Sequence, residues 1–189
     1  MRTKLPARTM RNTTMAGRIA VVDGTDSETI QRLFAAVAAD LEAEGVKVAG
    51  ALAEAPPLQD STCSAGLLRT LGTGEAYSIH LDAAPAGTSC HLDARGVELA
   101  CAAVLGDMRG CDLVVLSKFG KLEAIGEGLF PVFAAAAVAR TPTLTTVSAR
   151  HRQAWLAFAP DADLVDADIA AVKRWWHQAS RLSTGDPPY

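Results

Sequence analysis

The chain of 189 residues is long enough to form one domain with a sizeable core, and 49% of its residues are hydrophobic. Its formal net charge of -3 argues against a general nucleic-acid-binding protein, which carries a basic excess. No apolar run is long enough to span a bilayer, and the cysteines form no CxxC pair or zinc-binding spacing, so we expect a protein of the reducing cytoplasm with no metal site.

The N-terminal segment is basic and lacks an apolar core. Residues 1–16 contain Arg2, Lys4, Arg8 and Arg11, which excludes a secretory signal. We expect residues 1–17 to form a disordered basic tail, within which Met15 offers an alternative start. Residues 18–182 are expected to form a single α/β domain, followed by a frayed tail at 183–189.

The first predicted elements form a βαβ unit. Arg18–Val22 reads as a buried strand, Ile30–Glu44 as a helix ended by Gly45, and Val46–Leu52 as a second strand. Within the helix, apolar residues recur at the i, i+3, i+4 spacing of one face: Ile30, Leu33, Phe34, Val37 and Leu41.

The following region, Ala53–Ser89, is irregular and contains one predicted strand, Ala76–Leu81. Asp93 is a candidate N-cap for the next helix. The later predicted elements are a helix at Ala94–Met108, a strand at Leu113–Leu116, a helix at Leu129–Ala139, a strand at Thr143–Val147 and a helix at about Asp168–Ser180. This alternation predicts a three-layer α/β domain with a largely parallel sheet.

The turn after the first strand has the architecture of a phosphate-binding loop, in which backbone N–H groups and a helix N-terminus hold an anion. Its residues are Asp23, Gly24, Thr25, Asp26, Ser27, Glu28 and Thr29. The loop has about the right size for the G-x-x-x-x-G-K-[ST] motif, but it contains one glycine and no lysine. We favour a capping box from Thr25 to Glu28 over triphosphate binding, because the acids would repel a polyphosphate.

The turn after the strand Leu113–Leu116 is rich in lysine. In an NTPase the strand at this place ends in Asp, commonly followed by Glu, to hold magnesium. Here a hydroxyl and an ammonium replace the acids in a turn that contains Ser117, Lys118, Gly120, Lys121 and Glu123. Such a turn attracts an anion and disfavours a metal cation. The alternative, solvated surface lysines with Glu123 as an exposed partner, stays open.

These residues resemble a nucleoside-triphosphatase family with a D-x-x-x-x-D-E-x-G-K-x-E signature, a small P-loop, RecA-like domain that hydrolyses nucleotides with magnesium. The resemblance covers roughly Arg18–Ala159. Gly120, Lys121 and Glu123 match the signature, whereas Ser117 and Lys118 depart from its acidic pair. The resemblance therefore implies the fold but not the hydrolytic activity.

The chain is closer still to an uncharacterised bacterial family of degenerate relatives, which share the N/S-K-F-G-K-x-E turn and a G-x-x-C-x-L-D segment. Here that segment includes Gly87, Thr88, Ser89 and Cys90. Members tend to be encoded near molybdenum transport and cofactor genes. The resemblance implies a P-loop NTPase-like fold with degenerate Walker motifs and a role near molybdenum.

Several other residues are candidates for function. Cys90 precedes a predicted helix start, where backbone N–H groups and hydroxyls can hold an oxyanion or lower the pKa of a thiol, although a packed loop cysteine is the favoured alternative. Arg150, His151 and Arg152 follow a strand and could meet the lysine turn across the sheet edge, and a solvated cationic turn is an equal alternative. The remaining candidates are two histidines beside the Cys90 loop and two tryptophans of the last helix that suit either the core or a homodimer surface: His80, His91, Trp175 and Trp176.

The leading hypothesis is a non-hydrolytic accessory protein that binds an oxyanion, such as molybdate or phosphate, or a nucleotide. Lys118, Lys121 and the loop Gly87–Cys90 would form its pocket, without a metal ion. Two alternatives remain: an active NTPase, in which Asp23 or Asp26 holds magnesium, and a scaffold that inherited the fold.

Overall fold

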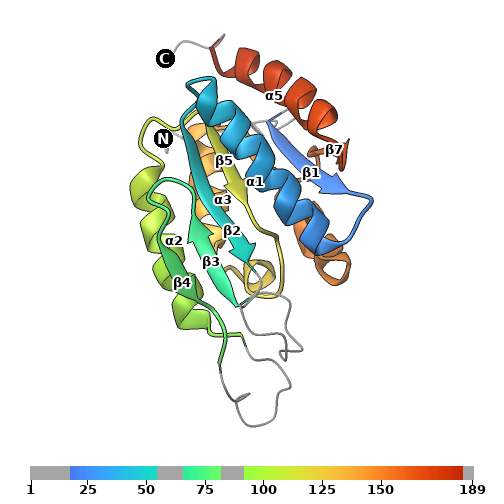
Figure 1. The fold of residues 1–189 in the computed structure, drawn as a ribbon. Coiled ribbons are helices and arrows are strands. Elements are labelled where there is room, and N and C mark those ends of the chain that lie inside the picture. Colours follow the sequence, from blue (N-terminus) through green and yellow to red (C-terminus); the bar gives the residue numbers. More distant parts are fainter. Residues whose placement is uncertain (1–17, 55–65, 82–91, 185–189) are drawn as a thin grey trace, which may run out of the picture.

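The computed structural model describes residues 18–54, 66–81 and 92–184 (Figure 1). They form one seven-stranded sheet in the order β4-β3-β2-β5-β6-β1-β7. The strands are β1 (Ile19–Asp23), β2 (Val48–Glu54), β3 (Leu67–Thr70), β4 (Ala76–Ser78), β5 (Leu113–Leu116), β6 (Thr143–Thr145) and β7 (Asp163–Asp166). The helices are α1 (Ser27–Ala43), α2 (Ala94–Asp107), α3 (Phe130–Ala139), α4 (Arg152–Phe158) and α5 (Ile169–Thr184), with 3-10 turns η1 (Glu123–Ile125) and η2 (Ala149–His151).

The sheet is mainly parallel. Strands β2, β5, β6, β1 and β7 run in one direction, whereas β3 pairs antiparallel with both β2 and β4. The prediction of an α/β domain with a largely parallel sheet is confirmed, and the antiparallel edge is an addition that the sequence pattern did not reveal. The carboxyl ends of the five parallel strands meet at one edge of the sheet, which we call the carboxyl edge.

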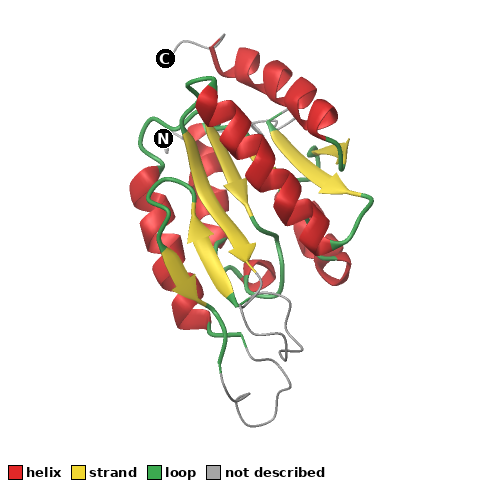
Figure 2. Cartoon of the chain, viewed as in Figure 1, coloured by secondary structure: helices red, strands yellow, loops and turns green. Residues whose placement is uncertain are grey.

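Helices cover both faces of the sheet (Figure 2). One core contains the apolar sides of α1 and α5, including Phe34 and Trp176, and the other contains those of α2, α3 and α4, including Val104 and Phe133. All four residues of β5 are completely buried, as expected for a central strand of a three-layer domain. Within the described ranges, no helix combines the length and apolar character needed to cross a membrane.

Capping residues define the main helices. Asp93 caps α2 by accepting a hydrogen bond from the Arg95 N–H (3.0 Å), which confirms its predicted role. Gly45 follows α1 in the left-handed conformation (φ +88°), and the Val46 N–H donates to the Leu41 carbonyl (3.0 Å). This C-terminal closure confirms the predicted role of Gly45. The start of α1 was misplaced, because the helix begins at Ser27 rather than at Ile30.

The sequence pattern did not predict three elements: β3, β7 and α4. Each is short, so its residues give too few repeats to show a period. Other boundaries moved by a few residues: β2 runs from Val48 to Glu54, β4 is limited to Ala76–Ser78, and α5 continues to Thr184. The predicted basic tail, residues 1–17, lies outside the described residues.

Packing of α2 against β4 depends on Gly96. A Cβ atom at this position would lie 1.8 Å from the Ser78 carbonyl oxygen, so the helix can approach the strand only without a side chain here. We expect Gly96→Ala to lower the free energy of unfolding by about 1–3 kcal/mol, because helix and strand must move apart. Gly106→Ala, in the same helix with open space around it, should instead stabilise by up to about 1 kcal/mol. Urea denaturation of both variants measures the difference, and equal midpoints would contradict this account.

Candidate functional site

The lysine turn, defined as residues 117–123, leaves β5 at the carboxyl edge. The Ser117 N–H donates to the carbonyl of Ala51 in the middle of β2 (2.9 Å). On the other side, the Phe119 N–H donates to the Thr146 carbonyl (2.8 Å), and the Ser148 N–H donates to the Phe119 carbonyl (3.0 Å). The turn therefore extends β5 between its two neighbours, as the sequence predicted for its place in the fold.

The Phe119 side chain anchors the turn in the core beside α3 and α4. It is 1% exposed and makes edge contacts with Phe133 and Trp155, with ring centroids 5.6 and 5.1 Å apart, and stacks on Phe158 at 6.3 Å. Aromatic pairs of this geometry add about 0.5–1.5 kcal/mol beyond the area they bury. These aromatic residues of α3 and α4 thus fix the lysine turn.

Glu123 fixes the other end of the turn. Its side chain is 7% exposed, and its two carboxylate oxygens accept hydrogen bonds from the Gly120 N–H (2.9 Å) and the Leu129 N–H (3.0 Å). Gly128 has φ +61°, and a Cβ there would lie 2.6 Å from Glu123 Oε1. The interpretation of Glu123 as an exposed partner of the lysines is therefore wrong. It holds the turn in shape, and both of its oxygens are already in use.

Two lysines project from this fixed backbone. Lys118 and Lys121 are exposed, and no carboxylate forms an ion pair with either one in the described part of the chain. The stem of Lys118 lies beside Gly120, because a Cβ at Gly120 would be 3.9 Å from Lys118 Cε. The carboxyl edge thus presents two cations without internal counter-charges, next to an anchored glycine.

The first loop differs from a phosphate-binding loop. Three residues, 24–26, separate β1 from α1, so the loop is shorter than predicted. The cap is Asp26 and not Thr25: the Asp26 carboxylate accepts from the Thr29 N–H (2.9 Å) and the Thr29 hydroxyl (2.7 Å). These two hydrogen bonds lower the pKa of Asp26 to about 2, and the bond from the Thr29 N–H has the larger effect. A carboxylate of the chain already occupies the place that an anion would take.

Asp23 connects the first loop to the segment after β6. Its Oδ2 lies 3.0 Å from Arg152 Nη2, and its Oδ1 accepts a hydrogen bond from the Gly24 N–H (2.8 Å). Ser148, four residues before Arg152, pairs with Phe119, so residues 150–152 follow directly on a segment hydrogen-bonded to the lysine turn. Arg150, also exposed, forms no ion pair among the described residues.

Gln31 is a residue of this edge that the sequence pattern did not single out. Its amide nitrogen donates to the Ser117 carbonyl (3.0 Å), and its amide oxygen accepts from the Ala53 N–H (3.1 Å). One side chain of α1 thereby ties the ends of β2 and β5 together. The signal in the sequence is a polar residue beside the apolar positions of a helix.

Some predicted residues cannot be placed. Gly87, Thr88, Ser89, Cys90 and His91, together with Cys63, lie outside the described residues. The described residues next to that loop are paired: His80 bridges to Leu92, and the Asp93 N–H donates to the Ile79 carbonyl (2.9 Å). Of the other cysteines, Cys101 is buried and Cys111 half-buried, and burial raises the pKa of both thiols.

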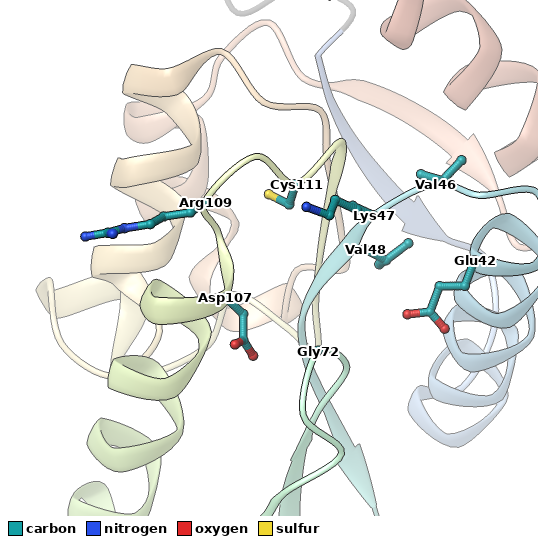
Figure 3. Close-up of a pocket in the computed structure, with 8 residues that line it drawn as sticks. All are labelled: Glu42, Val46, Lys47, Val48, Gly72, Asp107, Arg109 and Cys111. Atoms are coloured by element: carbon teal, nitrogen blue, oxygen red, sulfur yellow. The ribbon is translucent and has the colours of Figure 1, made fainter.

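A pocket with a volume of about 390 Å³ lies at the opposite edge of the sheet (Figure 3). Its charged residues come from the ends of α1 and α2 and the start of β2, and they are two acids and two bases: Glu42, Asp107, Lys47 and Arg109. Balanced charges do not favour an anion, so this pocket is no substitute for the carboxyl edge. Trp175 and Trp176 are 5% and 6% exposed and belong to the core.

The bonds of Glu123 predict a measurable contribution to stability. We expect Glu123→Gln to lower the free energy of unfolding by about 1–3 kcal/mol, because an amide replaces a carboxylate that accepts two buried backbone hydrogen bonds. Glu127→Gln, an exposed change in the same loop, should have almost no effect. Chemical denaturation of the two variants tests this, and equal stability would show that Glu123 does not hold the turn.

The cap predicts a dependence on pH. Asp26 has a folded-state pKa of about 2 against an ordinary value of 3.8, so its charge stabilises the fold above pH 4 and loses this effect as the pH falls toward 2. Asp26→Asn keeps a cap but removes the titrating group. The melting temperature of this variant should lie below that of the wild type at pH 6 and approach it near pH 2. A constant difference across this range would rule out the proposed linkage.

Comparisons with known proteins identify the family to which the chain belongs. A family described as "Protein of unknown function (DUF2478)" matches residues 19–175. The chain is also similar to the Molybdenum import ATP-binding protein ModC 2 of Bradyrhizobium diazoefficiens, with 30% identity over 166 residues. That match covers 86% of this chain but 18% of the relative, so the chain spans less than a fifth of the relative's length. No solved structure matches the chain significantly. Because the family model extends from β1 into α5, the chain belongs to the DUF2478 family.

Proposed function

We propose that this protein binds a small oxyanion or a nucleotide at the carboxyl edge without hydrolysing it, and acts as a cytoplasmic accessory protein in molybdenum handling. The observation that carries the proposal is the pair Lys118 and Lys121. Both are exposed, neither has an ion-pair partner in the described residues, and the turn that holds them is fixed by Phe119 and Glu123.

The position of this turn supports ligand binding. Open α/β sheets bind ligands in the crevice at the carboxyl ends of their strands, and the lysine turn follows a central strand of this sheet. A lysine ammonium acts as a compact point charge with three donors, so a pair of them suits a tetrahedral oxyanion such as molybdate or phosphate. The backbone that carries both lysines is already fixed before the ligand arrives, which lowers the cost of binding. The loop Gly87–Cys90 remains a predicted second wall.

The acids of the first loop and of the lysine turn support binding without hydrolysis. Hydrolytic P-loop domains need acids free to hold magnesium and a lysine in the first loop. Here Asp23 is paired with Arg152, Asp26 caps α1, and Glu123 accepts two backbone hydrogen bonds. The positions of the magnesium-binding acids are taken by Ser117 and Lys118, which favour an anion.

The comparisons support the molybdenum context and, through the ATP-binding name of the relative, a P-loop-like fold. The relative is named for molybdenum import and for ATP binding, and a segment of it resembles most of this chain. More than four fifths of the relative has no counterpart here, so its ATP-binding function is not thereby assigned to this domain.

A panel of ligands tests the proposal. We expect at least one of molybdate, tungstate, sulfate, phosphate, ATP and GTP to raise the melting temperature. At a ligand concentration of a hundred times Kd, the free energy of unfolding should rise by about 2.7 kcal/mol. Lys118→Ala combined with Lys121→Ala should remove most of that gain. The matched control is Lys47→Ala combined with Arg109→Ala, which removes the same charge at the opposite edge and should keep the shift.

Two outcomes would count against the proposal. If no ligand changes the melting temperature, the fold is better explained as an inherited scaffold. If the protein releases phosphate from ATP or GTP in the presence of magnesium, and Asp26→Ala abolishes the release, it is an NTPase with unusual residues.

A further inference from the structure

The sheet has a switch point between β1 and β6. These strands are neighbours, with Ile19 opposite Thr143. After β1 the chain continues into α1, which packs on one face of the sheet with α5, and after β6 it continues into η2 and α4, which pack on the other face. The two loops therefore diverge at the carboxyl edge, the arrangement that creates a ligand-binding crevice in open α/β sheets.

One ion pair spans this switch point. Asp23 comes from the loop after β1 and Arg152 from the segment after β6, and their side chains meet at 3.0 Å while each stays 62% exposed. Asp23 is also held by its own loop through the Gly24 N–H. Next to Arg152, the buried Nδ1 atom of His151 has no hydrogen-bond partner among the described residues. Buried polar atoms normally have a hydrogen-bond partner, and the described residues supply none to this nitrogen.

We propose that Asp23 is an internal substitute for the bound anion: its carboxylate occupies Arg152 until an oxyanion takes its place. This inference rests on the proposed function, and it adds Arg152 to the lysine turn as a third cation. An exposed ion pair is weak, so a ligand with two negative charges and a geometry suited to the guanidinium fork can displace the carboxylate. Asp23 then sets affinity by competition, and its loss makes binding stronger.

The sign of that effect separates this idea from a structural role. Asp23→Asn keeps the Oδ1 acceptor for Gly24 but removes the competing charge. We expect it to lower the Kd for molybdate, measured by isothermal titration calorimetry, by about two- to fivefold, the range typical of an exposed ion pair. Arg152→Gln should raise the Kd. When Arg152→Gln is already present, adding Asp23→Asn should lower the Kd no more than removal of a neighbouring negative charge does.

Asp166 provides the neighbouring charge. It is the register partner of Asp23 on β7, it is exposed, and it forms no ion pair among the described residues. Asp166→Asn removes one negative charge one strand away without releasing Arg152. A Kd that falls equally in Asp23→Asn and Asp166→Asn would overturn the inference, as would a gain that persists without Arg152. If the wild type binds neither molybdate, phosphate nor ATP, the proposed function itself fails, and this outcome is distinct from the other two.

Discussion

The pairing of Phe119 with the chain after β6 is the interaction on which the carboxyl edge depends. Its backbone N–H and carbonyl both bond to that segment, and its ring is buried among aromatic residues from α3 and α4. The pairing brings the segment that leads to Arg152 beside the lysine turn. Without it, the lysines and Arg152 would belong to two independent loops, and bringing these loops together would carry an additional entropic cost.

Some charged side chains at this edge have partners within the chain, and others have none among the described residues. The acids Asp23, Asp26 and Glu123 all act within the chain, as an ion-pair partner, a helix cap and a backbone acceptor. The lysines at 118 and 121 have no such function in the described structure. The lysine turn therefore stays cationic although the whole chain has a net charge of -3.

Much of the fold could be predicted because its signals are local. The apolar period of α1, the glycine that ends it and the Asp93 cap of α2 each depend on residues a few positions apart. The site was harder to predict because its bonds are distant in sequence. Gln31 reaches the Ser117 carbonyl across 86 positions, and the burial of Glu123 follows from the path of the chain to Leu129, which no periodicity records. The cap was placed one residue early because Thr25 and Asp26 are both good capping residues, and their backbone geometry decides between them.

The position of β1 between β6 and β7 has a consequence for folding. Both hydrogen-bonding neighbours of this first strand come from the last third of the chain, and Asp23 and Arg152 are 129 positions apart. Contacts of such long range are slow to form because a large loop must close first. During synthesis, β2 and β5 can pair while β1 still waits for its neighbours. The switch point is therefore among the last parts of the molecule to assemble, and Asp23 cannot meet Arg152 before the domain is almost complete.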